Sequence, residues 1–448
     1  MDNQLTSSIR IANVSELEKQ QLLSKLFWKI MPVLFIAYFF SFLDRVNIGY
    51  AKLQMQESIG FTDSQYAMAA GIFFIGYAFF EIPSNILMDK IGARKTMARI
   101  MVLWGLTSAA TMFVSTAWQL YFLRLLLGIF EAGFFPGVIL YLSFWFPSYM
   151  RGRVTSILIL ATLAAPIVGG PISGLLMTHM NGVHGLGGWQ WMFFIEAMPI
   201  IVIGLFCLFY LTDKPQSSRW LNHDERLLHK KMLQEDIQDE VTSTNSHSGA
   251  VVLGCLKDYR IYLLASLAFA AYCGSYGFNF WLPTMIKEMG VTDIAQISFY
   301  AVIPFSLAAV GMLTVGRSSD KRRERRWHYA ISMLFGAAMM ALAAFWQGDL
   351  ISRLVILGLA GFGFSGGVVV AWSLPAAYLK GKAAPGGIAM VSTLATMSGL
   401  FAPWIIGFMR ENTGTNAGAL LSIAMVMVIA ALIMIFLIPA KAVYVSEK

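Results

Sequence analysis

Twelve long apolar segments run through this chain of 448 residues, and each is long enough to cross a lipid bilayer as a helix. They are continuously apolar instead of alternating over about ten residues, which excludes a membrane β-barrel. Because 57% of the residues are hydrophobic and only 13% are charged, a water-soluble fold could not bury so much apolar surface. The sequence therefore predicts an all-α membrane protein with twelve transmembrane helices. We place the spans at 30–51, 65–88, 97–115, 118–145, 154–177, 190–212, 262–285, 298–315, 328–346, 352–378, 386–408 and 417–438.

The chain lacks the motifs of several other function classes. Its three cysteines form no closely spaced pair, and its six histidines show no metal-ligand spacing. No G-x-x-x-x-G-K-[ST] stretch is present to hold the phosphates of ATP. The polar N-terminus has no signal-peptide pattern. We therefore expect no metal site, no cofactor and no ATPase activity.

The basic residues predict how the chain is oriented. Of the 33 lysines and arginines, 27 lie in the two termini and in every second loop, and only four lie in the opposite loops. The positive-inside rule makes the first set cytoplasmic, together with both termini. The net charge of +8 then reflects topology, so no nucleic-acid partner is expected. The expected domains are a cytoplasmic N-terminus (1–29), a six-helix bundle (30–212), a cytoplasmic linker (213–258), a second six-helix bundle (259–438) and a cytoplasmic C-terminus (439–448).

The two halves repeat one pattern of loop charges. The loop after the second span reads Asn85-x-x-x-Asp89-Lys90-x-Gly92-x-Arg94-Lys95, and the loop after the eighth contains Gly316-x-x-x-Asp320-Lys321. The two aspartates are 231 residues apart, and the basic pairs Arg151/Arg153 and Lys380/Lys382 repeat at an offset of 229. This near-constant offset predicts two pseudo-symmetric bundles, an architecture that many transporters share.

The first of these loops resembles the signature loop of the major facilitator superfamily. Within that superfamily the chain resembles the anion:cation symporter family, in the branch of tartrate, hydroxyphenylacetate and sugar-acid permeases. The resemblance covers nearly the whole chain and implies the major facilitator fold in a bacterial inner membrane. That fold closes around its own site, so we expect a monomer. The stretches that carry the resemblance are SFLDRVNIG (41–49), LRLLLGIFEAGFFPG (123–137), FWFP (144–147), GWQWMFFIEAMP (188–199), NFWLP (279–283) and AWSLPAAYL (371–379).

Four charged residues lie inside the first and fourth spans, where each costs at least about 2.5–3.5 kcal/mol to insert. They are Asp44, Arg45, Arg124 and Glu131. At about 1.5 Å per helical residue, Asp44 and Arg124 lie at similar depth, which predicts an ion pair. Glu131 lies about 10 Å deeper on the face of Arg124, and Gly128 between them is expected to leave space for a ligand. A purely structural cluster that locks the two helices together is the alternative.

These four charges predict coupled transport. When both acids are ionised, the two negative and two positive charges cancel. Binding of one proton makes the site positive, which favours an anion. Proton and anion therefore favour each other's binding. We assign the coupling proton to Glu131, with Asp44 as second choice. Arg45 is expected to bind the substrate carboxylate with its bidentate guanidinium, beside Arg124.

The predicted function is a proton-coupled symporter that imports a small organic carboxylate by alternating access. A hydroxy-acid, a sugar acid and an aromatic acid all fit this site. The proton gradient would supply the energy, and the partners would be the organic anion, protons and the lipid bilayer. A proton-coupled exporter or drug antiporter of the same fold is the alternative. A membrane enzyme or receptor is a more remote one, because no nucleophile–base pattern is visible.

Other residues are assigned secondary roles, and for each of them plain helix packing or topology marking is the alternative. Further substrate contacts are expected at residues that match the family pattern and at the polar stripe of the eleventh span. These residues are Tyr77, Tyr276, Asn279, Trp372, Ser373 and Ser392. A cytoplasmic gate made of inter-helix charge pairs is expected at Asp89, Arg94, Lys95, Asp320 and Arg325. Glu81 and Glu196 also lie in apolar stretches, and we expect them to pair with loop cations.

Overall fold

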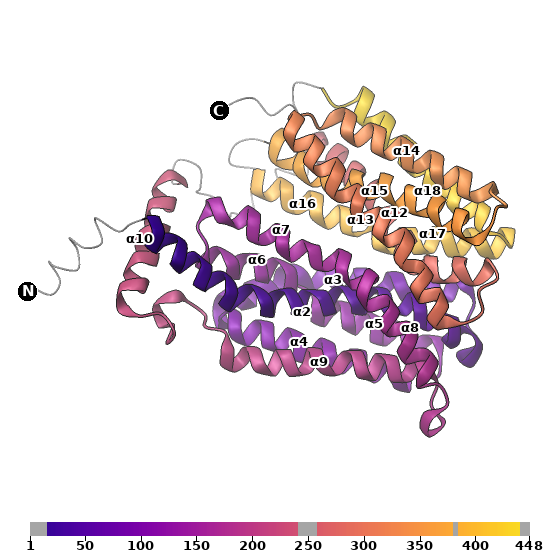
Figure 1. Ribbon diagram of the computed structural model, residues 1–448, viewed down its shortest axis with the longest axis horizontal. Helices are drawn as coiled ribbons and strands as arrows, with labels where there is room; N and C mark the ends of the chain where they lie inside the picture. Colours follow the sequence, from indigo (N-terminus) through magenta and orange to yellow (C-terminus); the bar gives the residue numbers. More distant parts are fainter. Residues whose placement is uncertain (1–15, 241–257, 380–383, 440–448) are drawn as a thin grey trace, which may run out of the picture.

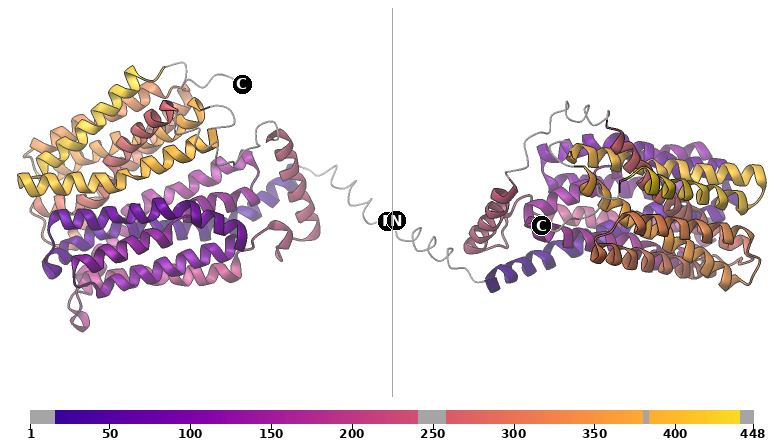
Figure 2. Two further views of the ribbon diagram at one scale, coloured as in Figure 1. Left: turned by 180° about the vertical axis from the view of Figure 1, so that it is seen from behind. Right: turned by 90° about the horizontal axis from the view of Figure 1, so that it is seen from above.

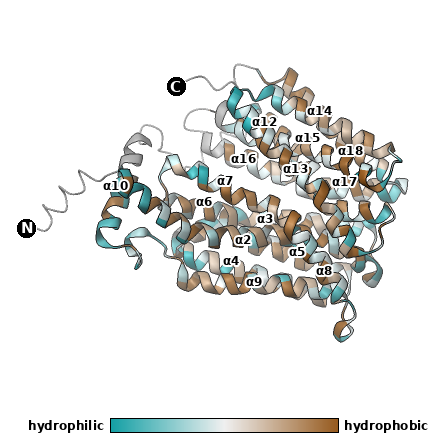
Figure 3. Cartoon of the chain, in the orientation of Figure 1, coloured by the Kyte–Doolittle hydropathy of each residue, from teal (hydrophilic) through white to brown (hydrophobic). Residues whose placement is uncertain are grey.

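The computed structural model describes residues 16–240, 258–379 and 384–439, and the regular elements in these ranges are helices. Eleven helical segments are long and apolar enough to cross a membrane. Large apolar side chains such as those of Trp118, Phe209 and Phe436 are exposed, as expected where lipid is the solvent. Figure 3 shows apolar residues along the helices and polar residues gathered toward their ends. The predicted all-α membrane fold is confirmed.

The first bundle contains the six predicted spans of the N-terminal half (Figure 1). Its fourth span is made of two helices, and a π-helical turn at Ala165–Gly169 divides its fifth. The third span lies outside the eleven most apolar segments, because three basic residues lie near its start. The helices are α2 (Glu16–Ile59), α3 (Asp63–Ile91), α4 (Ala93–Ala110), α5 (Ala117–Glu131), α6 (Phe134–Trp145), α7 (Ser148–Ala164), α8 (Gly170–His179) and α9 (Gly188–Tyr210).

The second bundle contains the other six spans and lies beside the first (Figures 1 and 2). The most extensive contacts between the bundles join α2 with α12, α3 with α17, and α8 with α13. Gly407 of α17 packs directly on Ala67 of α3, because small residues allow helices to approach closely in a membrane. The helices are α12 (Tyr259–Glu288), α13 (Ile294–Arg322), α14 (Arg326–Phe345), α15 (Leu350–Tyr378), α16 (Ala384–Thr396), α17 (Ser398–Thr413) and α18 (Asn416–Phe436).

Helix α2 is continuous over 44 residues, or about 66 Å, which is roughly twice the thickness of the hydrocarbon core. Its N-terminal end therefore reaches beyond the neighbouring helices, toward α10 (His223–Glu240), as Figure 1 shows. We call the end of the molecule where α2 begins and α10 lies the α10 end, and the other end the far end (Figure 1).

Helix α10 docks on the first bundle, although the sequence predicts only a solvated linker here. The ring of Trp220, just before α10, stacks on Trp145 at the end of α6 with centroids 5.3 Å apart. His229 of α10 is buried, and its Nε2 lies 3.0 Å from the carbonyl oxygen of Trp145. Lys25 of α2 forms a 2.7 Å ion pair with Glu225. Residues 241–257, the rest of the predicted linker, lie outside the described ranges.

The docking of α10 is expected to weaken at acidic pH. Burial lowers the pKa of His229 below its ordinary value of about 6.5, although the contact with Trp145 opposes this. The undocked state therefore binds more protons, and docking loses free energy as the pH falls through about 6.5. Hydrogen exchange of α10, corrected for intrinsic rates, should be faster at pH 5.5 than at pH 7.5. In His229→Gln, which can still donate to the Trp145 carbonyl, this pH difference should disappear; an equal difference in the variant would contradict the assignment.

Candidate substrate and proton site

The fourth span is interrupted directly after Glu131. Helix α5 ends at that residue, Gly133 takes a φ of 83°, and α6 begins at Phe134. Positive φ favours glycine, so Gly133 was the available sequence signal for this break. The predicted span at 118–145 agrees with the apolar segment Ala117–Trp145, and the break inside it was not predicted. The break places the Glu131 carboxylate at the C-terminal end of α5, where the helix dipole favours a nearby cation.

That cation is Arg45 of α2. Its Nε and Nη2 atoms lie 2.8 and 2.6 Å from Oε1 of Glu131, and the hydroxyl of Ser41 donates to the same oxygen at 2.6 Å. Glu131 is fully buried, and its second oxygen, Oε2, has no hydrogen-bond partner in the described ranges. An unsatisfied buried carboxylate oxygen is costly, so this atom is a natural position for a proton or a ligand donor.

Arg124 of α5 is the second buried cation, at 1% exposure. Its Nη1 donates to the backbone carbonyl of Asp44 at 3.3 Å. Its Nε and Nη2 have no partner among the described residues. The guanidinium groups of Arg45 and Arg124 both lie near the ring of Phe73, at 5.4 and 5.3 Å from its centroid. The two cations therefore lie beside the same ring, and Arg124 has two donors without a partner in the described residues.

The predicted ion pair between the side chains of Asp44 and Arg124 is wrong. The Asp44 carboxylate instead accepts hydrogen bonds from Trp104 Nε1 at 2.9 Å and from the Ser108 hydroxyl at 2.5 Å, both on α4. Asn47 adds a third bond at 3.3 Å. Because α4 satisfies this carboxylate, Arg124 is left free for another anion.

Glu196 of α9 belongs to the same polar chain, which the sequence did not predict. Asn47 donates to its Oε2 at 3.0 Å and Ser173 to its Oε1 at 2.6 Å. Asn47 thus bridges the carboxylates of Asp44 and Glu196. No ion pair of Glu196 or Glu81 with a cation occurs within the described residues, so the expected pairs with loop cations are wrong for those ranges.

Gly128 packs against α3 and leaves no space for a ligand. A Cβ atom at this position would lie 2.0 Å from the carbonyl oxygen of Phe73. The expectation of an open gap here is wrong, because the glycine serves close helix packing. The side chain that lies beside the Arg124 guanidinium is instead the Phe73 ring.

The predicted tyrosines extend the site across the two bundles. The Arg45 guanidinium lies 4.9 Å from the ring centroid of Tyr77, and it also interacts with the hydroxyls of Tyr77 and of Tyr276 on α12. Tyr272 stacks on Tyr276 and accepts a 2.5 Å hydrogen bond from Trp372. Arg45 of the first bundle is thereby connected to an aromatic cluster of the second.

The other predicted substrate residues form hydrogen bonds within their own helices. Asn279 is buried and donates to the Ser275 carbonyl at 2.8 Å, while its Oδ1 has no partner in the described part. Ser373 donates to the carbonyl of Val370 within its own helix. Ser392 accepts from Thr396 through its backbone carbonyl. No described contact joins Ser373 or Ser392 to the four charged residues.

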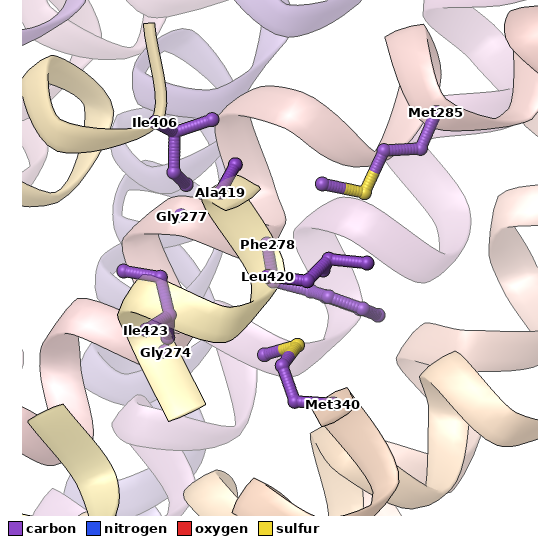
Figure 4. A pocket seen from close by; sticks show the side chains of 9 residues that line it. All are labelled: Gly274, Gly277, Phe278, Met285, Met340, Ile406, Ala419, Leu420 and Ile423. Carbon is purple, nitrogen blue, oxygen red and sulfur yellow. The ribbon is translucent and has the colours of Figure 1, made fainter. Parts of the chain in front are cut away.

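An apolar gap inside the second bundle is not a candidate for this chemistry (Figure 4). Its volume is about 10 Å³, which is room for one water at most, and it is lined by aliphatic, methionine and phenylalanine side chains between α12, α14, α17 and α18. A polar substrate would find neither space nor hydrogen-bond partners there.

At the far end, the ion pairs Asp63–Arg410 and Glu57–Lys287 join the two bundles. Asp63 of α3 accepts Lys52 Nζ at 2.8 Å and Arg410 Nε of α17 at 3.0 Å. Arg410 also pairs with Glu288 of α12, and Lys287 pairs with Glu57 of α2 at 3.0 Å. The sequence placed these cations in loops and missed the lock, which we define as Lys52, Asp63 and Arg410.

Breaking the lock should open the far end. Truncating one partner of a buried charge pair costs about 3–5 kcal/mol, whereas an exposed pair is worth about 0–1 kcal/mol. Asp63→Asn should therefore speed hydrogen exchange at the adjoining ends of α3 and α17, and Lys287→Gln, which breaks only the more exposed pair, should change it little. Equal exchange in both variants would show that the lock does not hold the bundles together.

At the α10 end, the described charge pairs of the predicted gate residues remain within one bundle. The backbone N–H of Arg94 donates to Asp213 at 2.8 Å, and Asp320 pairs with Arg325 at 2.6 Å. Lys95 has no described partner, and the side chain of Asp89 lies outside the described part. The described pairs across the bundles are thus at the far end, as expected for a state closed there.

Comparison with known proteins agrees with this architecture. The family model of the Major Facilitator Superfamily matches residues 34–383 and 264–448. An Agrobacterium vitis protein named "Putative tartrate transporter" is 40% identical over 423 residues, covering 94% of this chain and 96% of that one. An Acinetobacter baumannii protein named "Quinolone resistance transporter" is 35% identical and covers 92% and 94%.

Among solved structures, the fold is similar to the partially occluded, inward-open conformation of the xylose transporter XylE from Escherichia coli. The TM-score is 0.71 at 16% sequence identity, and the match covers 93% of this chain and 98% of XylE. The family consists of multi-pass membrane transporters, which are not enzymes. This chain belongs to the major facilitator superfamily.

Proposed function

We propose that this transporter is a proton-coupled symporter that imports a small organic carboxylate. The observation that carries the proposal is the free Nε and Nη2 of buried Arg124, facing the same region as the Arg45–Glu131 pair. Free guanidinium donors fit a carboxylate in a bidentate geometry. The similarity to a protein named for tartrate transport supports the same class of substrate.

The pairing of Arg45 with Glu131 provides a mechanism of coupling. While Glu131 is ionised, its Oε1 occupies two nitrogens of Arg45 and competes with an incoming anion. A proton on Glu131 weakens that pair and frees Arg45 for the substrate. Anion and proton then stabilise each other's binding, which is the thermodynamic requirement for symport. Because Arg45 also interacts with Tyr276, its release reaches the second bundle.

We further propose that the α10 end faces the bacterial cytoplasm and that the protein acts as a monomer. The excess of basic residues in the loops of this end supports the orientation. The termini and the linker would then be cytoplasmic, and the far-end lock would close the external side. Alternating access would exchange this lock for contacts at the α10 end, where Asp89, Arg94, Lys95, Asp320 and Arg325 would act.

Transport in proteoliposomes tests this proposal. The panel is tartrate, gluconate and hydroxyphenylacetate, with glycerol as the uncharged control. An acidic outside should drive accumulation of at least one acid, and the same acid should raise the unfolding temperature more at pH 5.5 than at pH 7.5. A ligand at 100 times its Kd stabilises by about 2.7 kcal/mol. If no acid accumulates while the protein remains folded, the proposal is wrong.

Drug export is the second candidate, favoured by the similarity to a protein named for quinolone resistance. The aromatic side chains of Phe73, Tyr77 and Tyr276 around Arg45 would suit a flat aromatic molecule with a carboxylate. Inside-out vesicles distinguish the two functions. Antiport predicts that an acidic lumen drives drug accumulation, whereas symport predicts that it drives loss of the carboxylate.

A further inference from the structure

A groove of about 530 Å³ lies on the second bundle, away from the charged site. It runs between α13 and α14, with Phe362 of α15 also lining it. Residues of the first bundle take no part in its lining, so the groove is distinct from the site around Arg45. Its size is that of an ordinary ligand site.

The lining of the groove changes along its length. Polar groups gather where α13 ends and α14 begins, at Ser318, Arg322, Glu324 and His328. Val315, Ile331, Phe335 and Phe362 line the part that extends along the membrane-spanning helices. From Trp327 to Phe335 the axial rise is about 12 Å. One end therefore suits a charged head group and the rest suits a hydrocarbon chain.

The polar end belongs to a basic loop, in which residues 317–326 hold six arginines and lysines against two acids, and the one acid that lines the groove is engaged by hydrogen bonds. Glu324 accepts the backbone N–H groups of Trp327 at 2.7 Å and His328 at 3.1 Å, and its Oε2 lies 2.7 Å from His328 Nδ1. Burial raises the pKa of the Glu324 carboxyl, but these hydrogen bonds outweigh the effect of burial and hold the pKa below its usual range. Arg322 is exposed and has no partner within the described residues. Its guanidinium is available to an anion.

We propose that the groove binds an anionic glycerophospholipid, with its phosphate at Arg322 and an acyl chain along Ile331, Phe335 and Phe362. Basic pockets between transmembrane helices on the cytoplasmic side are sites for such head groups. Trp327, which is 51% exposed at the start of α14, lies where tryptophan marks the membrane interface. The apolar part selects a lipid over a soluble phosphate.

The test uses the full-length protein, delipidated in detergent, and lipid binding measured by native mass spectrometry. Phosphatidylglycerol should bind at least about fivefold more tightly than phosphatidylcholine, and Arg322→Gln should remove this preference, because one cation near the surface contributes about 1 kcal/mol. Arg317→Gln is the matched control: it removes a charge from the same helix end that does not line the groove. It should leave the preference unchanged.

Three outcomes would overturn the proposal. One is equal affinity of the unmodified protein for the two lipids. Another is that Arg322→Gln and Arg317→Gln reduce the preference for phosphatidylglycerol equally, which would indicate general attraction of anionic lipids by the basic loop. The third is displacement of phosphatidylglycerol by millimolar inorganic phosphate, which would make this a site for soluble anions. Unfolding temperatures without lipid verify that both variants are folded.

Discussion

Glu131→Gln is expected to abolish accumulation of the carboxylate driven by a pH gradient while exchange of labelled for unlabelled substrate continues. Glutamine cannot release a proton, so the carrier would stay in the form that accepts the anion. It would still bind and turn over substrate, but the gradient could no longer do work on it. The measurement is uptake into proteoliposomes with an acidic outside, beside counterflow at equal pH on both sides.

Two further observations make this result specific. Glu131→Asp keeps a titratable group and should retain part of the gradient-driven uptake, because Ser41 and Arg45 remain to bind it. Loss of uptake and counterflow together in folded Glu131→Gln would remove Glu131 from proton coupling. It would instead indicate a structural role in positioning Arg45.

Arg124→Gln is expected to weaken binding of the carboxylate by a factor of about 100 or more. Its Nε and Nη2 are the free donors of the site, and a hydrogen bond to a charged group contributes about 1.5–3 kcal/mol. Arg124→Lys should not restore affinity, because an ammonium group lacks the planar fork. Isothermal titration calorimetry measures the Kd.

Arg353→Gln serves as the control for this prediction. Arg353 is a cation at the start of α15, and its Nε donates to the carbonyl of Gly348 at 2.8 Å, away from the charged site. It should leave the Kd unchanged. If Arg124→Gln also leaves it unchanged while lowering the unfolding temperature, Arg124 only joins α5 to the Asp44 carbonyl.

The charged site could be predicted in part because membranes make charge placement costly. Intramembrane charges at matching depths on two spans were sufficient to identify Asp44, Arg45, Arg124 and Glu131 as one cluster. Their pairing could not be predicted, because it depends on Trp104 and Ser108. Those residues lie on α4, whose rotation about its own axis has no signature in the sequence.

The fold was predictable to a similar extent. Hydropathy gave the twelve spans, and the repeated loop charges gave the two bundles. The same periodicity does not reveal breaks within a span, such as the one at Gly133, or whether a glycine like Gly128 opens a space or closes one. The lock of Lys52, Asp63 and Arg410 was missed because its members come from both bundles, and only the docking of those bundles brings them together.

Helix α2 connects three regions of the molecule as one uninterrupted rod. Lys25 near its start contacts α10, Arg45 at its middle holds Glu131, and Lys52 near its end belongs to the lock. A tilt of this rod that relieves the Arg45–Glu131 contact must also displace both ends. Protonation of Glu131 in the middle of the membrane would therefore move the ends of α2 at both membrane surfaces at once, and no separate signalling element would be needed.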